Sequence, residues 1–249
     1  MTATVTIGGL PIAVMSRAET ALWMLTEADR RPRGHHPLYL TSANGEVIAR
    51  TRKDWELRQQ FLAADQIMAD GQPMVWASRI RCRTPLPERV ATTDLFHDVA
   101  KLAEVTGHSF YLLGATADEN ARALANVRRL YPRLNIAGAS HGYHTGVALT
   151  EKLSEIDALA PDILWLAMGV PHEQRFVAAH ADELTHVGMI KTSGGLFNFL
   201  SGRNARAPDW MQRAGLEWLY RIMLEPRRLF WRYFVTNPVA IWQMLRYSE

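Results

Sequence analysis

The sequence predicts an α/β fold: a Rossmann-like parallel sheet flanked by helices, with a C-terminal amphipathic helical appendage. Two observations support this fold class. Over residues 94–191, short apolar runs alternate with helix-length segments, which is typical of parallel sheets. After residue 202 the composition changes, because Arg and Trp become concentrated there. We therefore expect an α/β core over 1–202 and an appendage over 203–249, without an internal repeat or a long linker.

The N-terminal part contains the less regular elements. Apolar runs indicate strands, and apolar side chains three and four residues apart indicate helices. Asp70-Gly71 is expected to stop a strand, and Pro73 to open the helix that follows it. The expected elements are a strand or hairpin over 7–14, a helix over 17–30, a strand over 38–41, a helix soon after 44, a helix over 54–64, a strand over 66–69 and a helix over 73–80.

The rest of the core is the regular alternation. A proline-punctuated loop over 84–93 precedes it, and the apolar run over 162–168 is typical of a strand buried on both faces. The expected elements are helices over 94–106, 118–130, 150–159 and 172–182, and strands over 109–113, 135–139, 162–168 and 187–191.

The tail has its own charge and pattern. Residues 203–249 contain eight Arg, no Lys, four acidic residues and four of the eight Trp, so the tail is net +4 and the remainder net −1. Pro208 is expected to open a helix and Pro226 to begin a second one. One apolar face is expected to contain Trp210, Met211, Ala214, Trp218, Leu219, Ile222 and Met223. This pattern suits an anionic membrane surface, and the alternative is a helical pair packed on the core with a solvated Arg face.

Composition excludes several classes of protein. Cys82 is the single cysteine, so there is neither a disulfide framework nor a CxxC metal site. The N-terminus does not have the pattern of a signal peptide, and no apolar run approaches the ~20 residues that span a bilayer. The core contains no recognised nucleic-acid motif, so we expect no nucleic-acid partner. The expected location is cytoplasmic and peripheral, on the inner face of the cell membrane.

Ligands of open parallel sheets bind beyond the carboxyl ends of the strands. Glycines there allow close approach of the backbone, and helix N-termini bind phosphate, so these loops suit a nucleotide diphosphate. Ordinary strand-to-helix turns explain the same glycines equally well, and neither GxGxxG nor a P-loop is present. The segments in question are Ser42-Ala43-Asn44, Asp70-Gly71, Gly114-Ala115-Thr116, His141-Gly142-Tyr143 and Gly169-Val170-Pro171.

Two side chains are candidate catalysts by type and position. Asp70 follows a short strand, where a carboxylate suits a general base, although a turn-forming Asp-Gly is the commoner explanation. Ser140 lies in a G-x-S-x-G pattern, which makes a serine hydrolase the rival hypothesis. That pattern requires a helix directly after the serine, and the residues after Ser140 read as loop. No His, Cys or carboxylate cluster indicates a metal, so we expect no metal and no cofactor.

Taken together, these residues resemble the WecG/TagA/CpsF family of bacterial glycosyltransferases over nearly the whole chain. The stretch 206–238 carries most of the resemblance. The other matching segments are Asn44-Gly45-Glu46 with Ile48, Ala69-Asp70-Gly71 with Val75-Trp76-Ala77, Pro87-Glu88-Arg89-Val90 with Asp94, FYLLG at 110–114, His141-Gly142-Tyr143, Gly169-x-Pro171 and the glycine-bounded segment 194–202.

The resemblance implies an inverting, metal-independent transfer from a UDP-sugar to a polyprenyl-diphosphate-linked sugar at the inner membrane face. The product is expected to enter an exopolysaccharide or another cell-envelope polysaccharide. The order His172-Glu173-Gln174 is similar to an exopolysaccharide branch that includes xanthan-type glucosyltransferases, which favours glucose weakly. A non-catalytic module that binds UDP-sugar and membrane is the alternative. Self-association through the apolar tail is also expected, but the sequence does not indicate the number of subunits.

The resemblance also implies roles for individual residues. Asp70 matches the catalytic base, and Asn44 and Arg89 match substrate-binding positions. Thr41 and Ser42 both stand where one hydroxyl is expected, and either Glu173 or Gln174 is expected to contact the donor. The other donor- or acceptor-binding candidates are Gly114, Gly142, Tyr143, Gly169 and Pro171. The appendage arginines expected to meet diphosphate or membrane charge are Arg221, Arg227, Arg228 and Arg232.

Overall fold

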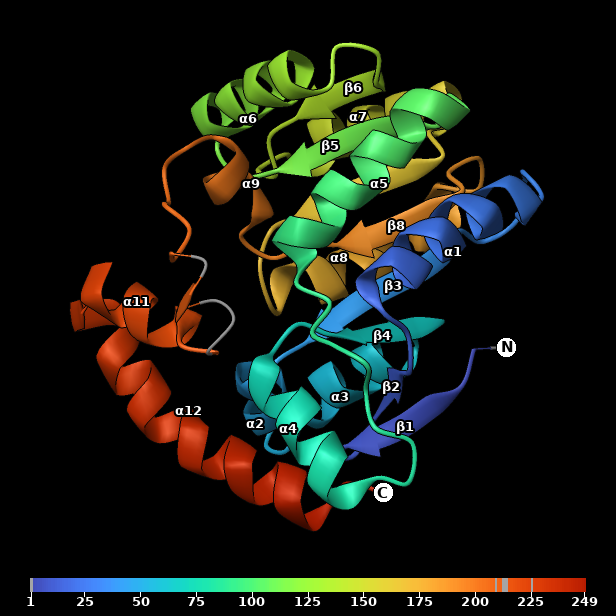
Figure 1. Cartoon of the computed structure of the whole chain (residues 1–249). Coiled ribbons are helices and arrows are strands. Elements are labelled where there is room, and N and C mark those ends of the chain that lie inside the picture. Colours follow the sequence, from blue (N-terminus) through green and yellow to red (C-terminus); the bar gives the residue numbers. More distant parts are fainter. Residues whose placement is uncertain (1, 209, 212–214, 225) are drawn as a thin grey trace.

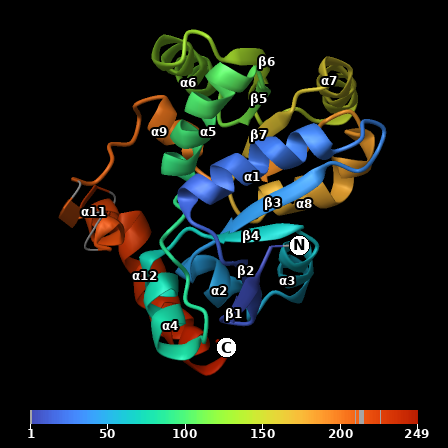
Figure 2. The ribbon, with the colours of Figure 1, turned by 45° about the vertical axis from the view of Figure 1, so that its right-hand side comes forward.

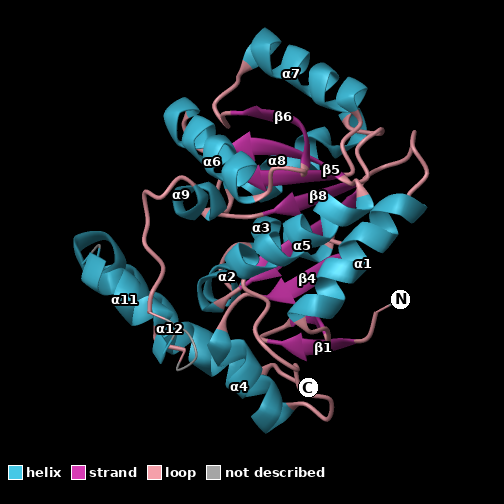
Figure 3. Ribbon diagram, turned by 45° about the horizontal axis from the view of Figure 1, so that its top comes forward, coloured by secondary structure: helices cyan, strands magenta, loops and turns pink. Residues whose placement is uncertain are grey.

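The computed structural model describes residues 2–208, 210–211, 215–224 and 226–249. A six-stranded sheet of order β4-β3-β8-β7-β5-β6 forms its centre, and every pairing in this sheet is parallel (Figure 3). This confirms the predicted fold class. The strands are β3 (Leu38–Ala43), β4 (Gln66–Ala69), β5 (Ser109–Gly114), β6 (Asn135–Ser140), β7 (Ile163–Ala167) and β8 (Met189–Thr192).

Helices cover both faces of the sheet (Figures 1 and 2). Because successive side chains of a strand point to opposite faces, Leu112 packs in one core and Leu113 in another. The first core contains side chains of α1 (Arg17–Arg30), α5 (Thr92–Thr106), α6 (Ala117–Leu130) and α9 (Leu196–Leu200). The second contains side chains of α7 (Gly146–Leu159) and α8 (His172–His180).

A third core lies below the β4 edge of the sheet in Figure 1. A strand or hairpin was predicted over 7–14, and the structure has a hairpin over 4–13, in which β1 (Thr4–Ile7) and β2 (Leu10–Ala13) pair antiparallel. The first strand therefore begins three residues before the predicted range. Around it pack α2 (Gly45–Thr51), α3 (Trp55–Leu62) and α4 (Gln72–Arg81). Ala240 and Met244 of the tail are buried in the same core, so the end of the chain is part of this layer.

The tail contains α11 (Glu217–Leu224) and α12 (Pro226–Arg246), and α12 runs beside α2 and α4 (Figure 1). Pro226 begins a helix as predicted, whereas Pro238 lies inside α12 without ending it. The single apolar face expected after Pro208 is wrong, because Gly215 (φ +67°) precedes the start of α11 at Glu217. Part of that expectation, Ala214 included, lies outside the described residues.

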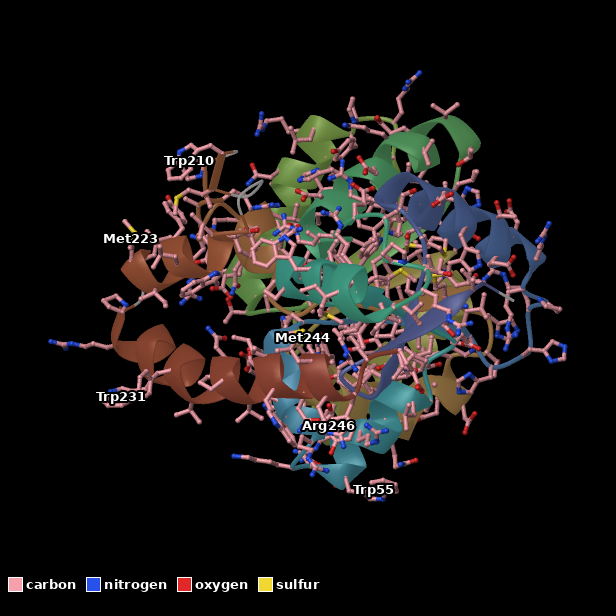
Figure 4. All side chains as sticks on the ribbon, turned by 60° about the horizontal axis from the view of Figure 1, so that its bottom comes forward. Trp55, Trp210, Met223, Trp231, Met244 and Arg246 are labelled. Atoms are coloured by element: carbon pink, nitrogen blue, oxygen red, sulfur yellow. The ribbon has the colours of Figure 1, made fainter. Side chains whose placement is uncertain are left out.

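The two faces of α12 differ in exposure rather than in polarity. Met244 is 3% exposed against the core, whereas Trp231 is 66% exposed and projects from the outer side of the helix (Figure 4). Their neighbours follow the helical period, so each face is continuous. The buried face contains Ala240, Gln243 and Met244, and the exposed face contains Trp231, Phe234, Val235, Trp242 and Leu245. None of the helices in the described ranges is long and apolar enough to span a membrane.

Three boundaries differ from the predictions in ways that affect the site. Helix α5 begins at Thr92, two residues before the predicted start, so Thr92 belongs to a helix rather than to the predicted loop over 84–93. The strand predicted over 38–41 continues through Ala43, because β3 pairs with β4 as far as Ala43↔Ala69. Ser42 is therefore part of a strand rather than a loop. Helix α7 begins at Gly146, four residues earlier than predicted.

Candidate active site

Asp70 follows β4 directly, at the carboxyl edge of the sheet. Its neighbours there are determined by the pleat. Leu40 pairs with Lys191 of β8, and Ser42 is two residues beyond Leu40, so Ser42 and Lys191 lie on the same face. Ser42 also pairs with Met68, which places Asp70, two residues beyond Met68, on that face as well. Three strands therefore bring a carboxylate, a hydroxyl and an ammonium group together.

Hydrogen-bond contacts connect these groups through the first residue of α5. Lys191 Nζ lies 2.9 Å from Ser42 Oγ, Thr92 Oγ1 lies 3.2 Å from the same oxygen, and Thr92 Oγ1 lies 3.3 Å from Asp70 Oδ2. Thr41 points to the opposite face, where its Oγ1 accepts a hydrogen bond of 2.7 Å from Thr192. Of the two hydroxyls that the sequence left open, Ser42 is the one beside Asp70.

The environment changes the protonation of both charged groups in this cluster. Burial raises the pKa of Asp70 to about 6, although the positive charges of Arg89 and Lys191 oppose this shift. Glu217 adds to the rise. Burial lowers the pKa of Lys191 to about 8, against the negative charges of Asp70 and Glu173. Both groups are therefore charged near neutral pH, and Asp70 titrates much closer to neutrality than an ordinary carboxyl, as suits a general base.

Arg89 connects the core to the appendage. Its Nη1 donates to Glu217 Oε2 of α11 at 2.8 Å, and its Nη2 lies 3.6 Å from Asp94 Oδ2. Arg206 binds the same two acids, with Nη1 2.8 Å from Asp94 Oδ1 and Nε 3.1 Å from Glu217 Oε1. Arg89 and Arg206, two fixed guanidinium groups, thus interact electrostatically with Asp70.

Asn44 has a structural role, because it directly precedes α2. It is the N-cap of α2, and its Oδ1 accepts a hydrogen bond of 3.1 Å from the N–H of Val47. Its Cβ lies 3.5 Å from where a Cβ of Gly71 would stand, so Asn44 is adjacent to the Asp70-Gly71 turn. A substrate contact of Asn44 remains a prediction.

Glu173 and Gln174 are both buried, at 3% and 1% exposure. Glu173 Oε2 accepts hydrogen bonds from the N–H groups of Gly169 at 3.2 Å and Gly194 at 2.8 Å, so it ties two loops together. Gln174 Nε2 donates to the other oxygen, Oε1, at 3.4 Å. Burial raises the pKa of Glu173, which the donor from Gly194 opposes. Their predicted contact with a donor remains a prediction.

Two of the predicted glycines, Gly114 and Gly142, are required by close packing. A Cβ on Gly114, which has φ +144°, would lie 2.2 Å from the carbonyl oxygen of Ala167. Gly142 packs on Gly114, since its Cβ would lie 3.1 Å from Gly114 Cα. Gly169 has φ +79° with open space around it. Pro171 is the N-cap of α8, after a cis peptide bond, and Tyr143 is 71% exposed. Ligand contacts of these residues remain predictions.

Ser140 ends β6 and lies 2.7 Å from His144 Nε2. This is a Ser–His contact, yet α7 begins only at Gly146, so the sharp strand-to-helix turn of a hydrolase nucleophile is not formed. Burial lowers the pKa of His144, and the neighbouring His141 adds to this. Within the described residues, no three His, Cys, Asp or Glu side chains are grouped as for a metal ion.

The appendage contributes residues to the site that were not predicted as site residues from the sequence. The side chains of Arg221, Arg228 and Arg232 lie outside the described residues, and Arg227 is exposed. Among the described residues of the appendage, Arg206 and Glu217 interact with Asp70 electrostatically. A cavity of about 250 Å³ borders this contact at Thr93 and Arg206. Lys191 was not predicted as a site residue either, although a lysine in an otherwise apolar strand is unusual and indicates a functional position.

Comparisons with known proteins agree on one family. The model described as Glycosyl transferase WecG/TagA/CpsF family matches residues 5–249. The chain is 30% identical over 199 residues to the N-acetylglucosaminyldiphosphoundecaprenol N-acetyl-beta-D-mannosaminyltransferase of Bacillus subtilis (strain 168), covering 80% of this chain and 75% of that protein. Enzymes with the same name are similar in Bacillus spizizenii, at 29% over 85% of this chain and 80% of the relative, and in Staphylococcus aureus (strain MRSA252), at 27% over 77% and 74%.

Proposed function

The chain belongs to the WecG/TagA/CpsF family of glycosyl transferases, and on this premise we propose that it transfers a hexose from a UDP-sugar to a sugar linked to polyprenyl diphosphate. The observation that carries the proposal is the environment of Asp70. Its carboxyl lies at the carboxyl edge of a parallel sheet, its pKa is raised to about 6, and arginines of both the core and the appendage flank it. Buried carboxylates with specific charged partners are typical of catalytic positions.

Asp70 is the proposed general base. It takes the proton of the acceptor hydroxyl while that oxygen attacks the anomeric carbon of the donor sugar. The bond between the anomeric carbon and UDP breaks in the same step, and its electron pair leaves with UDP. Because attack comes from the face opposite the leaving group, the configuration at the anomeric carbon inverts.

Arginine charge is proposed to stabilise the departing diphosphate. Arg89 and Arg206 hold their guanidinium groups in fixed ion pairs, and Arg suits phosphate because it donates two parallel hydrogen bonds. Both arginines pair with the carboxylates of Glu217 and Asp94, which are oxyanions like phosphate. Fixed donors of this kind need no reorganisation when charge develops, so we propose that no metal is required.

The relatives support the proposed acceptor class and widen the range of donors. Their printed name describes enzymes that act on N-acetylglucosaminyldiphosphoundecaprenol and transfer N-acetylmannosamine. Glucose, which the order His172-Glu173-Gln174 favoured, finds no specific support in these matches. We therefore propose a UDP-hexose donor, with UDP-glucose and UDP-N-acetylmannosamine as the two to test first.

We further propose that the appendage, residues 203–249, docks the enzyme on the inner face of the membrane. The exposed apolar face of α12 supports this, because Trp231 and Phe234 are 66% and 65% exposed and their rings contact each other on this face. The tail charge of +4 favours anionic lipid. Docking there brings a lipid-linked acceptor to the appendage side of Asp70, as exopolysaccharide or cell-envelope synthesis requires.

The test is a transfer assay on vesicles that contain a polyprenyl-diphosphate-linked N-acetylglucosamine. A panel of UDP-sugars is offered with and without EDTA, to wild type and to Asp70→Asn. Product from one donor, insensitive to EDTA and reduced about 10²–10⁴-fold in Asp70→Asn, supports the proposal. Asp54→Asn is the matched control, because Asp54 caps α3 and Asn caps equally well.

The alternatives give different results in the same assay. A non-catalytic module binds UDP without forming product, and its binding is indifferent to Asp70→Asn. A serine hydrolase depends on Ser140, so loss of activity in Ser140→Ala with full activity in Asp70→Asn would contradict the proposal.

A further inference from the structure

Lys191 is a fully buried lysine in the middle of the sheet, at 0% exposure. Its aliphatic stem lies on the face where Trp165 and Leu40 pair with it, and its Nζ donates to Ser42 Oγ at 2.9 Å and to the Thr192 carbonyl at 2.6 Å. Burying an ammonium group is costly unless it interacts with specific partners. Burial of the Lys191 ammonium group therefore costs stability, and its hydrogen bond to Ser42 connects it to the groups around Asp70.

The chemistry of the groups fixes the direction of the hydrogen bonds. A charged lysine only donates, and an ionised carboxylate only accepts. Thr92 has one hydroxyl proton, which it donates to Asp70 Oδ2. In the contact between Thr92 and Ser42, the donor is therefore the hydroxyl of Ser42. Ser42 in turn accepts from Lys191. With Asp70 ionised, the chain has a single order: Lys191 to Ser42 to Thr92 to Asp70.

We propose that Lys191 is a positioning residue that acts through Ser42 and Thr92 to hold Asp70 ionised and oriented. The ordered chain ends on Oδ2, which leaves Oδ1 to receive the acceptor proton. In the transfer step that proton moves from the acceptor hydroxyl to Oδ1, the new bond to the anomeric carbon forms, and UDP leaves with the electron pair. Lys191 keeps its proton throughout. This inference rests on the proposed function of Asp70 as the base.

Other charges face the same groups and have to be separated from Lys191. Asp70 interacts with Arg89, Arg206 and Glu217 as well as with Lys191. Both arginines are in ion pairs with Glu217, which offsets their effect on Asp70. Lys191 is buried and interacts electrostatically with Asp70 and Glu173, and Glu173 itself accepts hydrogen bonds from two backbone N–H groups. Lys191 is therefore the cation connected to Asp70 through the hydroxyl chain.

The decisive measurement is a titration of Asp70 itself, which does not depend on turnover. The whole protein is labelled with ¹³C at the aspartate carboxyls, and the signal that disappears in Asp70→Asn identifies Asp70. In Lys191→Met the titration midpoint is expected to rise by about one pH unit or more, because an opposite charge is lost. The acid limb of the transfer rate is expected to move by the same amount, with the plateau recovered at higher pH.

Three variants test the hydroxyl chain and the charge separately. Lys191→Arg keeps the charge and is expected to hold the midpoint near that of wild type. Thr92→Val removes the last donor and is expected to raise the midpoint by less than Lys191→Met. Thr192→Val is the matched control, because Thr192 is next to Lys191 and equally buried, yet its hydroxyl bonds Thr41 on the opposite face. Its midpoint is expected to be unchanged.

An unchanged Asp70 midpoint in Lys191→Met overturns the inference, even if the rate falls at every pH. If Lys191→Met does not fold, an unchanged midpoint in Thr92→Val overturns it instead. The failure of the proposed function has a different signature. In that case Asp70→Asn retains transfer, while the midpoint of Asp70 still responds to Lys191→Met.

Discussion

Arg89 Nη1 lies 2.8 Å from Glu217 Oε2, and this ion pair joins residues 128 positions apart in the sequence. Arg206 Nε lies 3.1 Å from the other oxygen of the same carboxylate. Both arginines also approach Asp94, so core and appendage meet in one charged network beside Asp70. Under the proposed function, a substrate diphosphate displaces the Glu217 carboxylate as the partner of these guanidinium groups.

Glu217→Gln is expected to shift the acid limb of transfer towards lower pH. The carboxylate of Glu217 raises the pKa of Asp70, so its removal lowers that pKa and Asp70 stays ionised to lower pH. At pH 5.5 the variant is expected to retain about two- to threefold more of its own plateau rate than wild type. Normalised pH–rate profiles measure this. Glu56→Gln on α3, whose carboxylate bonds Gln60, is the control, and a limb that moves upward contradicts the prediction.

The wild-type enzyme is expected to lose transfer activity as the pH falls through about 6. The base acts as a carboxylate, and burial raises the pKa of Asp70 to about 6. Above this value Asp70 is ionised and the rate is on its plateau, and below it the rate falls about tenfold per pH unit. A pH–rate profile at saturating donor measures the limb. A plateau that continues to pH 4.5 would be inconsistent with Asp70 as the base.

Gly114→Ala is expected to destabilise the fold by about 3 kcal/mol or more, because the new Cβ meets backbone that has no room to move. That Cβ would lie 2.2 Å from the Ala167 carbonyl oxygen, inside the β5–β7 pairing. Gly107→Ala is the control, since Gly107 also has positive φ (+85°) but faces open space, and it is expected to cost about 1 kcal/mol. Urea unfolding compares the two, and equal costs would disprove the steric explanation.

The double variant Trp231→Ser/Phe234→Ser is expected to weaken binding to anionic vesicles by about 30-fold or more, from the apolar area no longer buried in lipid. Both side chains belong to the exposed face of α12, so folding is expected to be unaffected. Vesicle co-sedimentation measures binding, and circular dichroism checks the fold. Leu22→Ser, at a 63% exposed position of α1, is the control. Unchanged vesicle binding in the double variant would remove α12 from the proposed docking surface.

Local patterns predicted most of the fold, as particular elements illustrate. The strand predicted over 66–69 matches β4, and the helix over 17–30 matches α1, whose Ser16 and Glu19 form a capping box. The misplaced boundaries depended on distant partners. Strand β3 extends to Ala43 because β4 pairs with it that far, and Gly215 interrupts the tail where it packs against Gln72 and Trp76 of α4.

By itself, the sequence determined the parallel α/β class, the family and the position of Asp70 after a strand, because these follow from local periodicity and from motifs. Only the tertiary structure decided which groups surround Asp70. The choice of Ser42 over Thr41 depends on the pleat of β3, and the approach of Lys191 depends on the order of strands in the sheet. The contact of Arg89 with Glu217 depends on where the appendage folds back. Such contacts join residues far apart in the chain, and local preferences of the sequence do not encode those distances.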